Sequence, residues 1–177
     1  MDKVKDAGVV TATAAKTVED KAGKYLTFRL DQEEYGLEIL KVREIIGLMN
    51  ITHVPRTPEY IRGVINLRGK VIPVLDLRKK FGMGTTDDTE ETCVIVVEVN
   101  SIGSAVMMGI IVDAVSEVLD IQGSQIEEAP SFGTNVDTRF ILGIGKVKDE
   151  VKILLDIDQV LAGSDVSMVQ EMGEQQA

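Results

Sequence analysis

Few residues of this sequence have side chains suited to catalysis or metal binding. His53 is the only histidine and Cys93 the only cysteine, so a nucleophilic site would have to pair them or use a distant serine. His53 lies in THVPRTP, which is typical of a loop, and Cys93 lies in the apolar run TCVIVVEV, where a thiol packs as a small hydrophobic residue. The acidic run GTTDDTEET (84–92) lacks the ligand spacing of a calcium loop and indicates a solvated charge run. We therefore expect no enzyme, no cofactor and no metal.

Basic residues are instead concentrated in one stretch around YIRGVINLRGKVIPVLDLRKKF (60–81). Residues 52–81 contain seven Lys and Arg against Glu59 and Asp76, a net charge of +5 in a chain whose formal charge is -10. Such a basic island indicates a docking surface for an acidic partner, an internal charge balance, or a solvated face that aids solubility. At its centre, Gly69 suits a tight turn, but a turn alone does not explain Arg68.

The composition of the 177 residues excludes several classes of function. A charge of -10 disfavours nucleic acid, and three Tyr, four Phe and no Trp give little material for stacking bases. No apolar run reaches the ~20 residues of a membrane helix, and the first residues lack the apolar centre of a signal peptide. The single cysteine fits a reducing compartment, so we expect a cytoplasmic protein without membrane insertion.

Short strand-like segments dominate the chain and predict a mainly β fold. Clear examples are YLTFRL (25–30), TCVIVVEV (92–99) and AVMMGIIVD (105–113). Only LKVREI (40–45) and the segments after Asp76 and Asp156 favour short helices, each aspartate being suited to cap a helix N-terminus.

An internal repeat gives the strongest organisational signal. Glycine, acidic and apolar positions coincide when two segments are shifted along the sequence. Shifting residues 60–81 by 80 positions matches Gly63 with Gly143 and Asp76 with Asp156. Shifting residues 35–46 by 73 positions matches Gly36 with Gly109 and Val42 with Val115. Gly63 and Gly143 are candidate bulges or sites of close backbone approach. We predict two similar small β-barrels, over residues 24–91 and 92–162, that share an apolar interface. We expect a disordered tail over 1–23 and a tail or helix extension over 163–177.

Several segments, in order, resemble the CheW family of bacterial chemotaxis coupling proteins. They are YLTFRLDQEEYGLEILKVREIIG, GVINLRGKVIPVLDLRKKF, GIIVDAVSEVLDI with IEEAP, and ILLDIDQVL, and together they span roughly residues 24–161. The resemblance implies two five-stranded SH3-like β-barrels on a shared apolar core, with short helices. It implies a non-catalytic scaffold that couples the cytoplasmic tips of methyl-accepting chemotaxis receptors to the CheW-like regulatory domain of the histidine kinase CheA, in membrane-associated arrays.

The resemblance also implies two sets of binding residues. The positions that match a receptor-facing groove between the barrels are Val42, Glu44, Arg68, Val115 and Val118. The positions that match sites of kinase coupling are Arg62, Gly63 and Val71. We expect Arg68 to pair with Glu44 and stiffen the edge of the groove, while a coiled-coil receptor tip lays apolar residues into it. Taken singly, each valine is also compatible with an ordinary core position.

Two other functions are compatible with a small β protein. An adaptor that also carries a receiver domain would need about 110–130 further residues, for which the chain has no room. A small-molecule-binding β-barrel would need an apolar cavity, and two barrels of this size leave little interior volume.

Overall fold

The computed structural model describes residues 18–84, 86–101, 104–129 and 138–161, and these residues form a mainly β structure. The strands are β1 Gly23–Leu30, β2 Glu33–Glu38, β3 Val42–Gly47, β4 Ile61–Leu67, β5 Lys70–Asp76, β6 Cys93–Ser101, β7 Ser104–Val112, β8 Ala114–Ile121, β9 Ile126–Glu127, β10 Ile141–Val147 and β11 Glu150–Leu155. The helices are short: α2 Val18–Lys21, α3 Leu77–Lys80 and α4 Ile157–Val160, with 3₁₀ turns η2 Ile39–Lys41, η3 Gly123–Gln125 and η4 Thr138–Phe140.

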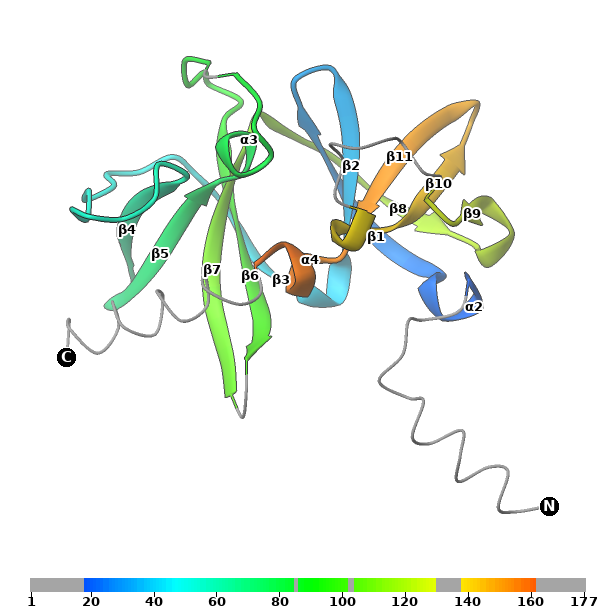
Figure 1. The fold of residues 1–177 in the computed structure, drawn as a ribbon, viewed down its shortest axis with the longest axis horizontal. Coiled ribbons are helices and arrows are strands. Elements are labelled where there is room, and N and C mark those ends of the chain that lie inside the picture. The colour runs from blue at the N-terminus through cyan, green and yellow to red at the C-terminus, as the bar shows by residue number, and fades with distance from the viewer. Residues whose placement is uncertain (1–17, 85, 102–103, 130–137, 162–177) are drawn as a thin grey trace.

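The strands form two curled sheets that stand beside each other (Figure 1). The five-stranded sheet has the order β3-β6-β7-β5-β4, and the six-stranded sheet has the order β8-β1-β2-β11-β10-β9. The predicted fold class, with two small β-barrel units, is therefore confirmed. The second unit differs in one respect, because the two-residue strand β9 adds a sixth strand at its edge.

The sheets do not follow the predicted division at residues 91 and 92. Strands β1 and β2 belong to the same sheet as β8–β11, and β6 and β7 belong to the sheet of β3–β5. Each repeat thus gives its first two strands to the other repeat's sheet. The cause is pairing between the repeats, which a split into two sequential barrels cannot provide. Strand β2 pairs with β11 and β5 with β7 in parallel, and β1 pairs with β8 and β3 with β6 in antiparallel fashion.

The repeat predicted from the sequence reappears in these parallel pairs. Gly36 lies opposite Leu154 in one sheet, and its repeat equivalent Gly109 lies opposite Val74 in the other. A Cβ atom on Gly36 would come within 2.9 Å of Leu154 Cδ2, and one on Gly109 within 2.7 Å of Val94 Cγ1. Both glycines therefore allow close packing where the two repeats exchange strands.

The apolar core has three parts. One cluster fills each barrel, around Ile65 and Val96 in the five-stranded sheet and around Tyr25 and Leu154 in the six-stranded sheet. The largest cluster lies between them and takes buried side chains from both sheets; it includes Leu26, Phe28, Leu37, Leu75, Ile95, Val97, Ile110, Leu155 and Leu161. This shared core confirms the expected apolar interface, which lets two small barrels bury enough surface to be stable together.

Two of the three predicted helices form. Asp76 caps α3 and Asp156 caps α4, and each carboxylate accepts a hydrogen bond of 3.3 Å from the backbone N–H three residues on. The prediction of a helix over 40–45 is wrong. The 3₁₀ turn η2 ends at Lys41, and the residues from Val42 onward form strand β3. The side chains of β3 alternate between half-buried and exposed, which is the period of a strand.

The predicted tail over residues 1–23 ends earlier than expected. Residues 18–21 form α2, where Lys21 is buried and its carbonyl accepts a 2.5 Å hydrogen bond from the hydroxyl of Tyr25. Residues 1–17 and the predicted segment 163–177 lie outside the described residues. Within the described part of the chain, no helix is long and apolar enough to cross a membrane.

Candidate functional site

The basic hairpin turns on two residues with left-handed backbone. Arg68 has φ 53° and Gly69 has φ 88°, between the paired residues Leu67 and Lys70 that end β4 and begin β5. Two consecutive positive φ values are the signature of a two-residue type I′ turn. Asn66 stabilises it, because its side-chain oxygen accepts a 2.8 Å hydrogen bond from the Gly69 N–H.

This turn directs Arg68 onto β3, where the expected pair with Glu44 forms. One guanidinium nitrogen donates to Glu44 Oε2 at 2.9 Å and another contacts Oε1, so the contact is bidentate. Hydrogen bonding to the guanidinium holds the pKa of Glu44 below its usual value, and the same bond raises the pKa of Arg68. The pair links the hairpin tip to the strand that carries Val42.

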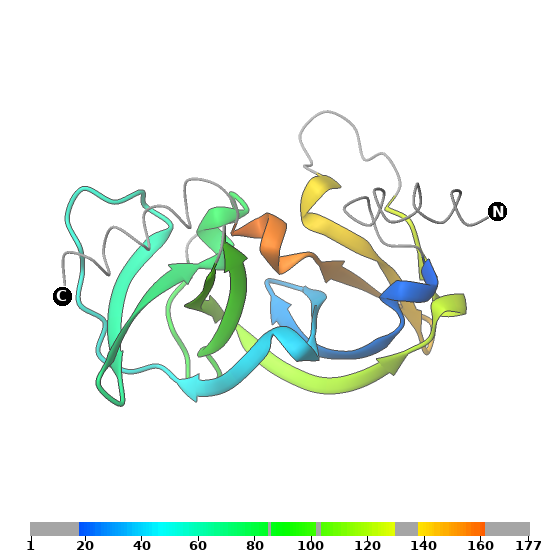
Figure 2. The ribbon, with the colours of Figure 1, turned by 90° about the horizontal axis from the view of Figure 1, so that it is seen from below.

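The predicted apolar residues lie on β3 and β8, which run along the same edge of the molecule in Figure 2. Val42 and Val115 are half-buried and both pack against the shared core. Val118 is 50% exposed on β8. Ile45 on β3 is 45% exposed and is the repeat equivalent of Val118. The sequence analysis missed Ile45, although the 73-residue shift that pairs Val42 with Val115 also pairs Ile45 with Val118.

Of the residues matched to kinase coupling, Arg62 is held by acids of its own chain. Its guanidinium lies 2.6 Å from Asp88 Oδ2 and 3.5 Å from Asp76 Oδ2. The acidic run 84–92 was expected to be solvated, but Asp88 neutralises part of the basic island, and Glu91 lies 3.8 Å from the Arg29 guanidinium. An internal charge balance therefore accounts for part of this island.

Gly63 lies at a bulge where another backbone segment approaches closely. The register of β4 and β5 shifts between Ile61 and Gly63, and Thr52 pairs with Val64 through two backbone hydrogen bonds of 2.9 Å. A Cβ atom on Gly63 would come within 2.1 Å of the Thr52 carbonyl oxygen. The third residue of this group, Val71, is 42% exposed on β5. The bulge or close approach predicted for Gly63 is confirmed.

Gly143 fills the equivalent position in the second repeat. The register of β10 and β11 shifts between Ile141 and Gly143, and β9 takes the place of the Thr52 segment. A Cβ atom on Gly143 would meet Ile126 Cγ2 at 2.8 Å and the Glu127 carbonyl oxygen at 3.1 Å.

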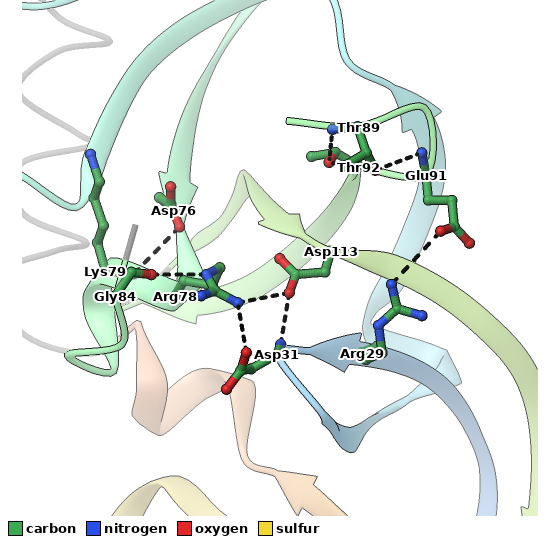
Figure 3. Close-up of polar contacts among 10 residues, drawn as sticks. All are labelled: Arg29, Asp31, Asp76, Arg78, Lys79, Gly84, Thr89, Glu91, Thr92 and Asp113. Carbon is green, nitrogen blue, oxygen red and sulfur yellow. Dashed lines mark hydrogen bonds and ion pairs between the residues drawn. The ribbon is translucent and has the colours of Figure 1, made fainter. Parts of the chain in front are cut away.

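An ionic cluster that sequence analysis missed lies where the chain passes from β7 to β8 (Figure 3). Asp113 occupies the single position between these strands and accepts a 2.8 Å hydrogen bond from Arg78 Nη1 and a 2.7 Å bond from the Asp31 N–H. Arg78 Nη1 also lies 3.9 Å from Asp31 Oδ1, and its Nε donates to the Gly84 carbonyl at 3.0 Å. The cluster joins α3 of the five-stranded sheet to the β1–β2 turn of the six-stranded sheet.

A second ionic contact lies where the chain passes from β2 to β3. Lys41 Nζ donates to Asp158 Oδ2 at 2.7 Å, and Asp158 Oδ1 accepts a 3.1 Å bond from the backbone N–H of Asn100. Asp158 belongs to α4, which follows the six-stranded sheet, and Asn100 belongs to β6 of the five-stranded sheet. This contact also crosses between the two sheets.

The two residues considered for catalysis lie in different surroundings. His53 is exposed in the loop before β4, whereas Cys93 is half-buried at the start of β6. Burial raises the pKa of the Cys93 thiol, which disfavours the reactive thiolate. Within the described ranges, no group of three or more His, Cys, Asp or Glu side chains is arranged to hold a metal ion.

Comparisons with known proteins agree with this architecture. The family model of the CheW-like domain matches residues 24–165. The chain is 38% identical over 164 residues to "Chemotaxis protein CheW" of Klebsiella aerogenes, covering 92% of this chain and 96% of that protein. It is 36% identical over 147 residues to the Bacillus subtilis protein of the same name, covering 82% of this chain and 91% of that one.

A solved structure, that of the scaffolding protein TtCheW from Thermoanaerobacter tengcongensis, matches with a TM-score of 0.72 and 40% sequence identity. The match covers 81% of this chain and 95% of that chain. The chain therefore belongs to the CheW-like family, the non-catalytic scaffold proteins of bacterial chemotaxis.

Proposed function

We propose that this protein couples methyl-accepting chemotaxis receptors to the histidine kinase CheA and so controls kinase activity in receptor arrays at the membrane. Two binding surfaces are needed for this function, one for each partner. The observation that carries the proposal is the apolar strip of Val42, Ile45, Val115 and Val118, which takes equivalent residues from both repeats and exposes two of them.

The receptor surface is the apolar strip together with the Arg68–Glu44 pair at its edge. Ile45 and Val118 present apolar side chains to water at 45% and 50% exposure, and the half-buried Val42 and Val115 connect the strip to the rigid shared core. An amphipathic helix binds by placing apolar side chains at intervals of three or four residues on such a surface. The bidentate pair holds the rim in one conformation, which lowers the entropic cost of binding.

The kinase surface is the outer face of the β4–β5 hairpin. Val71 offers an exposed apolar contact, and Arg62 offers a cation that Asp76 and Asp88 hold in place. Gly63 contributes through its backbone, because the bulge there sets the path of β4 relative to the Thr52 segment. An interface of this kind combines one apolar anchor with charged residues at its rim, as is common between proteins.

The packing counts against a small-molecule-binding β-barrel. Buried side chains fill the interior of each barrel, including Ile65, Ile72, Val74, Val94 and Val96 in one and Tyr25, Ile121, Ile126 and Leu154 in the other. A ligand inside either barrel would have to displace this core.

The receptor surface is tested by comparing two exposed valines of the six-stranded sheet. Val118→Asp places a charge in the strip and should weaken binding to the receptor's cytoplasmic fragment at least 30-fold, equivalent to about 2 kcal/mol. Val151 is 56% exposed on β11, away from the strip, and Val151→Asp should leave receptor affinity within about twofold. Isothermal titration calorimetry measures both, and equal affinities for the two variants would exclude this receptor surface.

The kinase surface is tested by comparing Val71 of β5 with Met49, which lies two residues after the end of β3. Val71→Asp should abolish co-elution with the regulatory domain of CheA, whereas Met49→Asp, at a similarly exposed position outside the hairpin, should co-elute like the unmodified protein. If the unmodified protein bound neither the kinase nor a receptor fragment, the coupling function itself would be wrong.

A further inference from the structure

The chain passes between the two sheets at two places in the described strands, and an ionic contact holds each of them. Residues 39–41 lead from β2 in the six-stranded sheet to β3 in the five-stranded sheet, and Asp113 leads back from β7 to β8. The strands that begin at these crossovers are β3 and β8, the two strands of the apolar strip. Lys41 immediately precedes Val42, and Asp113 comes two residues before Val115.

Both contacts have the same design, with the charges reversed. The 80-residue shift that relates the repeats places Arg78 of α3 on Asp158 of α4. Arg78 binds the acid Asp113 at one crossover, and Asp158 binds the base Lys41 at the other. The contact between helix and crossover is thus present in both repeats, although the residues that make it are of opposite sign.

Both contacts are also better shielded than the Arg68–Glu44 pair at the hairpin tip. The side chains of Arg78 and Asp113 are 13% and 18% exposed, and those of Lys41 and Asp158 are 23% and 30% exposed. By comparison, Arg68 is 70% exposed in its pair with Glu44. Water and salt screen a shielded pair less, so its geometry is held more firmly.

We propose that Arg78–Asp113 and Lys41–Asp158 are positioning pairs that fix β3 and β8 relative to each other, and thereby set the geometry of the receptor-binding strip. Each pair ties a crossover to a helix and, through Asp31 or Asn100, to the opposite sheet. The strip takes residues from both sheets, so a small rotation of one barrel against the other would separate its halves. The role in receptor binding rests on the proposed function, whereas the fixed arrangement of the barrels does not.

Charge reversal and charge exchange test the proposal. Arg78→Asp places two acids at one crossover, and the double variant Arg78→Asp with Asp113→Arg restores an opposite pair. We expect the single variant to bind a receptor fragment at least tenfold more weakly with kinase-domain affinity within twofold, and the exchanged variant to recover most receptor affinity. Arg78→Asp also removes the hydrogen bond from Arg78 to the Gly84 carbonyl. Lys41→Asp, alone and combined with Asp158→Lys, therefore repeats the test at the other crossover, where this bond is not affected.

A distance measurement tests the arrangement of the barrels independently of any partner. Spin labels at Val71→Cys and Val151→Cys, in a Cys93→Ser background, place one probe on the exposed hairpin of each sheet. Pulsed electron paramagnetic resonance should give one narrow distance in the starting protein, a broader or shifted distribution in each single variant, and a narrow one again after charge exchange. Where a reversal prevents folding, Arg78→Gln and Lys41→Met serve in its place.

The outcomes separate this inference from the proposed function. Folded single variants with an unchanged distance distribution would overturn the positioning role. If the protein binds no receptor, but a single variant changes the spin-label distance distribution and the exchanged pair restores it, the positioning role is supported and the proposed function is wrong. Equal loss of receptor and kinase binding in a single variant would indicate general destabilisation and would also overturn the proposal.

Discussion

Replacing Gly63 by alanine should destabilise the protein strongly, although it adds a single methyl group. The new Cβ atom would lie 2.1 Å from the Thr52 carbonyl oxygen and 2.8 Å from its carbonyl carbon, so the Thr52 segment must move. That movement breaks the two 2.9 Å backbone hydrogen bonds between Thr52 and Val64. The φ of Gly63 is 146°, a conformation that alanine adopts only under strain.

The expected loss follows from these two effects. Backbone strain of this kind costs about 1–3 kcal/mol. Two broken hydrogen bonds cost about 1 kcal/mol each. Together they give a loss of about 3–5 kcal/mol, a large part of the about 5–15 kcal/mol that stabilises a typical domain. For a chain of this length the melting temperature should fall by roughly 6–20 °C.

Two other glycines provide graded controls. Gly143→Ala also crowds a backbone carbonyl, at 3.1 Å, and a side chain at 2.8 Å, so it should cost about 1–3 kcal/mol. Gly47→Ala in β3 meets nothing within 4 Å and should change stability by less than about 0.5 kcal/mol. Chemical denaturation followed by far-ultraviolet circular dichroism measures all three. A Gly63→Ala variant within 1 kcal/mol of the unmodified protein, or no more affected than Gly47→Ala, would refute the reasoning.

Three further predictions concern single side chains. Because Arg68 lowers the pKa of Glu44, the stabilisation from this pair is fully present above the ordinary carboxyl pKa of 4.5 and is lost only as the pH falls through the lower pKa of the folded state. An NMR titration of the Glu44 carboxyl should therefore show its midpoint below 4.5. A midpoint at or above 4.5 would contradict the pair. Cys93 should react with a thiol reagent at pH 8 at least tenfold more slowly in the folded protein than in denaturant, since burial raises its pKa; equal rates would show that the thiol is not protected. Gly109→Ala should lower the free energy of unfolding by about 1–3 kcal/mol, because its Cβ would press on the β-branched Val94 at 2.7 Å, and an unchanged denaturation midpoint would mean that this contact relaxes freely.

The internal repeat made most of the fold predictable, but not which strands pair. The 80- and 73-residue shifts correctly identified Gly63 with Gly143 and Gly36 with Gly109 as equivalent positions. Equivalence shows that two segments have the same structure, but it carries no information on their partners. The exchange of strands depends on both parallel and antiparallel pairing between distant segments, and either arrangement buries the same apolar runs.

The candidate site was predictable where the family resemblance placed two residues of opposite charge at the same groove. The resemblance assigned both Arg68 and Glu44 to the groove, and the pair forms. Arg62 could not be matched to Asp88, because the acidic run 84–92 has no periodicity that fixes which carboxylate turns inward. The contact of Arg78 with Asp113 was missed for a related reason, since the two residues meet only where the chain changes sheet.

The exchange of strands between the repeats makes the two halves of the chain mutually dependent. Cutting near residue 91 leaves two fragments, and in each of them the first two strands have lost the other strands of their sheet. Neither fragment should fold alone, yet the two mixed together should reassemble, as split proteins do. A single repeat can complete its sheets only by exchanging strands with a second copy, so on its own it would have to form an intertwined homodimer.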